Sequence, residues 1–114
     1  MRPLLHQRTY VFATVDSLAA AAELDAVATV VEDRLVSVVV PSEAAEAAGL
    51  EGEFECAWIT LETETDLELV GLTAAVAARL ADAGIACNVI AGARHDHLFV
   101  PVGRAEEALQ LLGT

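Results

Sequence analysis

The feature that most constrains the fold of this chain is an order of patterned segments that occurs twice within 114 residues. The second round is the clearer. After the strand-like "CAWITLETE", the apolar residues of "TDLELVGLTAAVAARLADAG" recur at spacings of three and four, which predicts an amphipathic helix that ends at Gly84. The short apolar runs "IACNVIAG" and "HLFVPV" predict a hairpin, and "GRAEEALQLLG" predicts a final helix.

The first half is a weaker copy of the same order. Its segments are "RTYVFATV", "SLAAAAEL", "AVATVVED", "LVSVVVP" and "SEAAEAAG", and in the last of these we expect Ser42 as N-cap and Gly49 as helix stop. Each round is then a split βαβ unit of the α+β class, with a ferredoxin-like antiparallel sheet covered by helices. We predict one unit over residues 1–56 and another over residues 57–114. The segment "EFECAWITL" can close the first sheet or open the second, so strand borrowing between the halves, or from a partner chain, stays open.

Composition limits the classes of function. Eighteen acidic and six basic residues give a net charge of -12, which repels a phosphate backbone and an anionic bilayer. No segment reaches the ~20 apolar residues of a membrane span, and the first residues carry no apolar run of the kind a secretory signal needs. We therefore expect a cytoplasmic protein with no nucleic-acid and no membrane partner. Cys56 and Cys87 have no metal-type spacing and are expected to be reduced, buried thiols.

The triplet His95-Asp96-His97 allows three interpretations. On an extended strand His95 and His97 share a face and could hold one metal ion, but further ligands are missing nearby, because the only other histidine is His6 in the N-terminal segment. No hydrolase-type Ser or Cys motif accompanies the triplet. We therefore predict no metal, no cofactor and no catalytic residue, and we place the triplet at the tip of a hairpin.

The stretch "ITLETETDLELVGLTAAVAARLADAGIACNVIAGARHDHLFVPVGRAEEALQLL" resembles an ACT domain. The resemblance lies in the polar loop, the glycine at the helix start, the helix ending in "AGI", the Asn on the next strand and the hairpin before the last helix. The whole chain resembles small stand-alone bacterial proteins with two tandem ACT-like units. The resemblance implies two βαββα units of this type, related to the regulatory part of aspartate kinases and to arginine sensors, that bind an amino acid or a similar small ligand.

The resemblance also implies a ligand site. At Gly71 the backbone would approach the ligand, whose carboxylate the N–H groups around Val70, Gly71 and Leu72 would hold. A capping box of Thr65 and Glu68 would compete for the same donors. By motif position Asp96 would grip the charged end of the ligand. The implied ligand-binding residues are Asp66, Leu67, Val70, Gly71, Leu72, Asn88, Ile90, Gly92 and Asp96.

Two of these assignments carry further alternatives. Asn88 would lie at the ligand or subunit interface, but it could instead bond its own backbone or a sheet edge. Ala93 departs from the pattern of the similar arginine sensors, in which an aromatic residue is common, and this counts against arginine itself and leaves room for a bulkier or less basic ligand.

These observations predict a non-catalytic sensor or regulatory module that binds an amino acid and forms a homodimer. The alternative is a structural module for protein–protein interaction or dimerisation that has no ligand and joins subunits through an exposed sheet edge.

Overall fold

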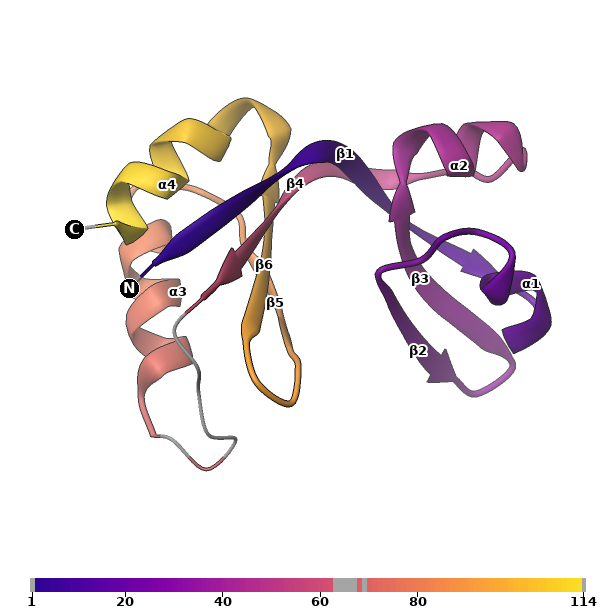
Figure 1. Cartoon of the computed structure of the whole chain (residues 1–114), viewed down its shortest axis with the longest axis horizontal. Coiled ribbons are helices and arrows are strands. Elements are labelled where there is room, and N and C mark those ends of the chain that lie inside the picture. Colours follow the sequence, from indigo (N-terminus) through magenta and orange to yellow (C-terminus); the bar gives the residue numbers. More distant parts are fainter. Residues whose placement is uncertain (1, 63–67, 69, 114) are drawn as a thin grey trace. The chain divides into compact units, whose positions relative to one another are not determined.

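The computed structural model describes residues 2–62, 68 and 70–113 and contains two rounds of the predicted order (Figure 1). The element order predicted from the sequence is therefore confirmed. The first round consists of β1 (Pro3–Val15), α1 (Leu18–Ala22), β2 (Ala28–Glu32), β3 (Leu35–Pro41) and α2 (Ser42–Ala47). The second round consists of β4 (Glu53–Leu61), α3 (Leu72–Asp82), β5 (Asn88–Ala91), β6 (Asp96–Pro101), the 3-10 turn η1 (Val102–Arg104) and α4 (Ala105–Leu112).

The chain forms two compact units that share two strands. The first unit is Arg8–Cys56, and the second unit combines Met1–Gln7 with Ala57–Thr114. Hydrogen bonding links the strands in the order β2-β3-β1-β4-β6-β5, so β1 and β4 are neighbours and each contributes one part to each unit. The beginning of β1 belongs to the unit built from the second half of the sequence. The domain limits 1–56 and 57–114 stay a prediction.

In the first unit, two short helices cover the sheet. The side chains of β1 and β3 that pack against these helices are Val11, Ala13, Val15, Val36, Val38 and Val40. The hydroxyl of Ser17 accepts the N–H of Ala20 at 3.1 Å and caps α1. Gly49 ends α2 as predicted: at φ 71° it lets the N–H of Leu50 reach the carbonyl of Ala45 at 2.9 Å.

The predicted N-cap of α2 is wrong by one residue. Pro41 occupies the cap position, and Ser42 is already the first residue of the helix. The reason is that the pyrrolidine ring of Pro41 fixes its φ, here at -55°, so that β3 passes directly into the helix. The Ser42 hydroxyl accepts a hydrogen bond from the Thr9 hydroxyl at 3.0 Å instead of capping.

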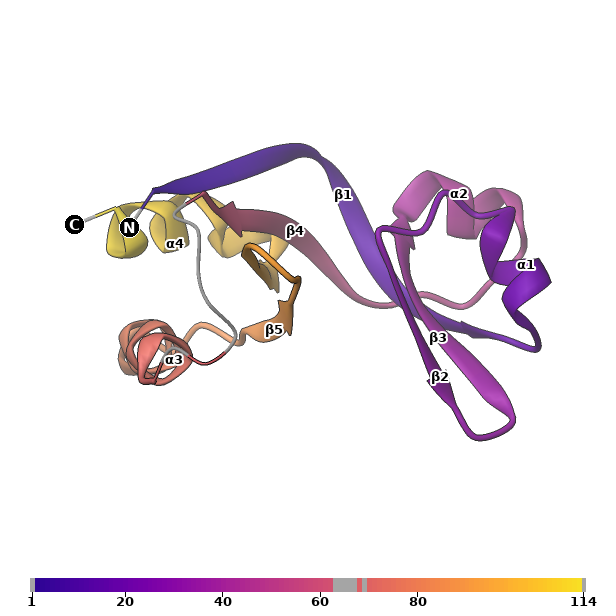
Figure 2. The ribbon, with the colours of Figure 1, turned by 60° about the horizontal axis from the view of Figure 1, so that its bottom comes forward.

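In the second unit, α3 and α4 lie on one face of the sheet (Figure 2). The residues that meet there include Val76 and Leu80 of α3 and Ala108 and Leu112 of α4, each at most 1% exposed. Their strand partners are Ala57, Ile59, Leu61, Leu98 and Val100. Gly84 ends α3 at φ 72°, as the sequence predicts. Helical periodicity therefore identified this core from the sequence.

Within the described residues, no helix is both long and apolar enough to cross a membrane.

Candidate functional site

The first group of predicted ligand residues lies at the start of α3. Gly71 is the N-cap residue, in the left-handed conformation with φ 97°. Because glycine has no side chain, it leaves the first N–H groups of α3 to other partners. Leu72 is half-buried, and Val70 is 94% exposed. The predicted Asp66 and Leu67, and Thr65 of the alternative capping box, lie outside the described residues.

The second group lies on the hairpin of β5 and β6. Asn88 pairs with Phe99, Ile90 with His97 and Ala91 with Asp96. The N–H of Gly92 donates to the carbonyl of His95 at 2.9 Å and closes the turn. A Cβ atom at Gly92 would meet that carbonyl oxygen at 3.1 Å and Nε2 of His97 at 3.2 Å, so only a glycine fits here without displacing its neighbours.

Asp96 is buried and lies on the face of β6 that the helices cover. It is 8% exposed, the one buried charged residue in the part of the chain that the structure describes. Since alternate residues of a strand share a face, Asp96 shares one with Leu98 and Val100 of the core. Asp96 and His97 are thus strand residues, not a solvated hairpin tip.

The two groups are brought to the same end of the second unit, where α3 begins and the β5–β6 turn lies (Figure 1). Not all the predicted side chains share one face. Asn88 and Ile90 alternate with Val89, which packs against the core, so they point to the face opposite Asp96. Asp96 therefore lies on the helix side of the sheet, as the start of α3 does, whereas Asn88 and Ile90 lie on the other side.

The opposite face carries a polar cluster that the sequence analysis missed. Nε2 of His6 lies 2.8 Å from Oγ1 of Thr60, which lies 3.0 Å from Nδ1 of His97. Trp58 donates its indole N–H to the same Nδ1 at 3.1 Å, and its ring stacks on that of His6 with centroids 3.5 Å apart. His6 is 54 positions from Thr60, so no local pattern brings them together. The available signal was alternation, which places Trp58 and Thr60 opposite Ile59 and Leu61.

Burial shifts both histidines of this cluster in the same direction. It lowers the pKa of His6 below its usual 6.5, and the nearby His97 lowers it further. Burial also lowers the pKa of His97, reinforced by the charge of His95 and opposed by that of Asp96. Both imidazoles are therefore held in the neutral form at pH 7.

Among the described residues there is no group of three or more His, Cys, Asp or Glu side chains placed to hold a metal ion. His95 and His97, considered above as two ligands of one metal ion, have different surroundings. His95 sits in the turn, whereas Nδ1 of His97 is occupied by the indole N–H of Trp58.

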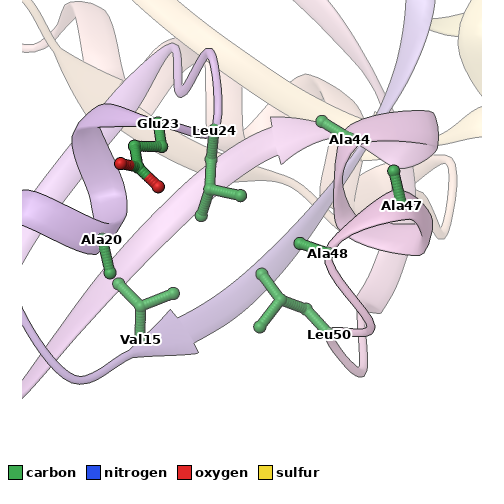
Figure 3. A pocket seen from close by; sticks show the side chains of 8 residues that line it. All are labelled: Val15, Ala20, Glu23, Leu24, Ala44, Ala47, Ala48 and Leu50. Carbon is green, nitrogen blue, oxygen red and sulfur yellow. The ribbon is translucent and has the colours of Figure 1, made fainter.

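An apolar groove in the first unit was also missed by the sequence analysis. It has a volume of about 540 Å³ and lies between α1 and α2 (Figure 3). Its lining consists of small and aliphatic side chains with one carboxylate: Val15, Ala20, Glu23, Leu24, Ala44, Ala47, Ala48 and Leu50. The two helices beside it are short, with five residues in α1 and six in α2.

Comparison with protein-family models shows which family the chain belongs to. A family model described as ACT domain matches residues 1–57, and a second model of the same description matches residues 53–114. The chain therefore belongs to the ACT domain family and consists of two tandem ACT domains with the ferredoxin-like α+β fold. ACT domains are generally regulatory modules that bind small ligands, so the family supports a regulatory, ligand-sensing role.

Solved structures agree with this assignment. A Vibrio cholerae protein of unknown function, described as a possible transport protein, is 45% identical over 97% of this chain and 86% of its own, with a TM-score of 0.92. An Agrobacterium tumefaciens protein is 20% identical over 97% of this chain and 85% of its own, with a TM-score of 0.80. The regulatory subunit of aspartate kinase from Thermus thermophilus, 16% identical over 97% and 94%, has a TM-score of 0.62 and shares the fold. A search of curated proteins gave no match.

Proposed function

We propose that this chain is a non-catalytic, cytoplasmic sensor that binds an amino acid and acts on its target as a homodimer. In this proposal the Asp96 carboxylate receives the ammonium or side-chain cation of the ligand. The N–H groups that follow Gly71 at the start of α3 receive the ligand's carboxylate, aided by the helix dipole.

The observation that carries the proposal is the position of Asp96. It is 8% exposed, the one buried charged residue among those that the structure describes, and it begins β6 next to the β5–β6 turn. That turn lies at the end of the second unit where α3 begins (Figure 1). A zwitterionic ligand between the two would supply a cation to Asp96 and an anion to the helix N–H groups. Neither a neutral nor a singly charged ligand would satisfy both ends.

A thermal-melting screen with the common amino acids tests ligand binding. A ligand present at 100 times its dissociation constant stabilises the folded state by about 2.7 kcal/mol. We expect one amino acid, or a small group of similar ones, to raise the melting temperature by several degrees in a concentration-dependent way. The matched Asp96→Asn variant should lose that rise while keeping the far-UV circular dichroism spectrum of the wild type. If no amino acid raises the melting temperature, the sensor proposal is wrong.

A second candidate is the structural interaction module, and the edge strand β2 favours it. This strand ends the sheet order and leaves Val30 and Val31 50% and 60% exposed. An edge strand of this kind has free backbone groups on one side and no lysine or proline that would block pairing with another chain. Sedimentation of the wild type and of a Val31→Lys variant tests this role. A dimer that the substitution converts to monomer, together with a failed ligand screen, would favour the module.

A further inference from the structure

The cluster of His6, Thr60, His97 and Trp58 joins three neighbouring strands. His6 comes from β1, Trp58 and Thr60 from β4 and His97 from β6, all on the sheet face opposite α3 and α4. His6 contacts the Thr60 hydroxyl and stacks on the Trp58 ring, and Trp58 donates a hydrogen bond to His97. The contacts lie within the second unit, on the face of the sheet opposite the Asp96 side chain.

With both histidines neutral, Trp58 and Thr60 each donate a hydrogen bond to an imidazole nitrogen. The indole N–H of Trp58 can only donate, so Nδ1 of His97 must accept and the proton of that ring lies on Nε2. Because one lone pair on Nδ1 is then in use, the Thr60 hydroxyl donates to Nε2 of His6 and not to His97. The proton of His6 accordingly lies on its Nδ1.

Protonation of His97 removes one of these hydrogen bonds. A proton on Nδ1 displaces the Trp58 N–H, 3.1 Å away, and donates to Oγ1 of Thr60, 3.0 Å away, which can accept it. Protonation of His6 on Nε2 makes that ring a donor to the same oxygen, and a cation stacked on an indole gains cation–π energy. Acid therefore frees the Trp58 N–H from His97 and, once both rings are charged, places two cations on either side of one hydroxyl oxygen.

Within the described residues, the charged or titratable groups that shift the two rings are histidines and one aspartate. His95 and Asp96 adjoin His97 on its own strand, and their charges act on it in opposite directions. From β5, the neighbours of His97 are Ile90 and the Gly92 backbone, which do not titrate. From β4, the partners are Trp58 and Thr60, which do not titrate in this range, and the principal charge acting on His6 is that of His97.

The segment held by the cluster is the beginning of β1. Residues 3–7 belong to the second unit although the rest of β1 belongs to the first. Besides the hydrogen bonding between β1 and β4, their attachment includes Leu5, which packs against the core, His6, and a backbone hydrogen bond from Glu62 N–H to the Arg2 carbonyl at 2.8 Å. Leu4, whose side chain points to the face opposite that of Leu5, is 44% exposed. His6 is thus the side-chain anchor of this segment on the face away from the helices.

We propose that His6, Thr60, His97 and Trp58 form a proton-sensitive clasp that fastens residues 3–7 of β1 to β4 and β6 at neutral pH and releases them in mild acid. The clasp needs no ligand, so it can be tested whether or not the sensor proposal holds. Since β1 passes through both units, release would loosen one of the two strands that they share. The lowered pKa values of both histidines agree with a closed, neutral clasp.

Fluorescence tests the clasp directly, because Trp58 is the only tryptophan of the chain. In the full-length wild type, titration from pH 8 to pH 5 should change the emission in one step with a midpoint below 6.5, the ordinary value for histidine. His97→Asn keeps an acceptor near the position of Nδ1 and cannot be protonated, so this variant should lose the step. The matched control His95→Asn removes a neighbouring histidine and should keep it.

Hydrogen exchange tests release of the strand. After correction for intrinsic rates, exchange in a peptide covering residues 3–7 should rise between pH 7.5 and 5.5, by up to about tenfold for each unit by which closure lowers the histidine pKa. Exchange in α4 should stay unchanged. If His97→Asn does not fold, histidine NMR titrations of the wild type replace it and should give midpoints below 6.5 for His6 and His97. The proposal is wrong if the wild type shows no fluorescence step, or if the step persists in His97→Asn. It is also wrong if the histidine midpoints lie at or above 6.5, or if the step occurs without faster exchange in residues 3–7.

Discussion

Gly52, just before β4, is the position where a single methyl group should cost the first unit most. A Cβ atom there would lie 2.7 Å from both Cβ and Cγ2 of Val11 and 3.0 Å from Cγ1. Val11 is 7% exposed within the core of the first unit, and its Cβ is bonded to the backbone of β1. It cannot rotate out of the way, so relief requires a shift of one strand against the other.

Gly52→Ala should therefore destabilise the protein by about 1–3 kcal/mol, the usual cost of an overpacked core. Gly103→Ala is the matched control, because no atom lies within 4 Å of the new methyl group and its backbone has no left-handed φ. That substitution should stabilise by about 0.4–1 kcal/mol through the unfolded chain. With a urea dependence of about 1–3 kcal/mol per M, the two midpoints should differ by roughly 1 M.

The assay is urea unfolding followed by far-UV circular dichroism, which reports on both units. Fluorescence of Trp58 would follow the second unit only. Equal midpoints for Gly52→Ala and Gly103→Ala would refute the close approach of β1 and the start of β4.

Three further predictions follow from the same structure. The pKa values of His6 and His97 are lowered in the folded state, so just below pH 6.5 the unfolded chain binds more protons than the folded chain. The urea midpoint should therefore fall as the pH drops below 6.5, and it should fall less in His97→Asn than in the wild type. An equal fall in both proteins would contradict this assignment. Burial raises the pKa of Cys56 to about 12, so in a Cys87→Ser variant at pH 8 an aromatic disulfide reagent should label no thiol until urea is added. Ser17→Ala removes the cap of α1 and should cost about 1 kcal/mol in urea unfolding, whereas an unchanged midpoint would show that the cap bond contributes nothing.

The parts of the fold that sequence reasoning found are those encoded by local patterns. The stripe of Val76 and Leu80, the stops at Gly49 and Gly84 and the β5–β6 hairpin all depend on residues close together in the chain. Alternation along β4 is a local pattern of the same kind, and it places Ile59 on one side and Trp58 on the other.

The parts that it missed depend on which strands become neighbours. His6 was set aside as a histidine of the N-terminal segment, because nothing local shows that β1 begins in the second unit beside β4. For the same reason His97 was considered beside His95, and its actual partners Trp58 and Thr60 were not. The position of Asp96 in a strand, and not at the tip, follows from its pairing with Ala91. Its role, and those of Gly71 and Asn88, remain predictions.

Titration calorimetry on the wild type, Asp96→Asn and Glu106→Gln, with the amino acid that raises the melting temperature most, tests the central claim most directly. Glu106 is an exposed carboxylate of α4, so its variant controls for the loss of one negative charge. If Asp96 pairs with the ligand's cation, Asp96→Asn should weaken binding by about 2–5 kcal/mol, or about 30-fold and more, and Glu106→Gln should bind as the wild type does. Equal affinities for all three proteins, with unchanged circular dichroism spectra, would remove Asp96 from the site and contradict the account.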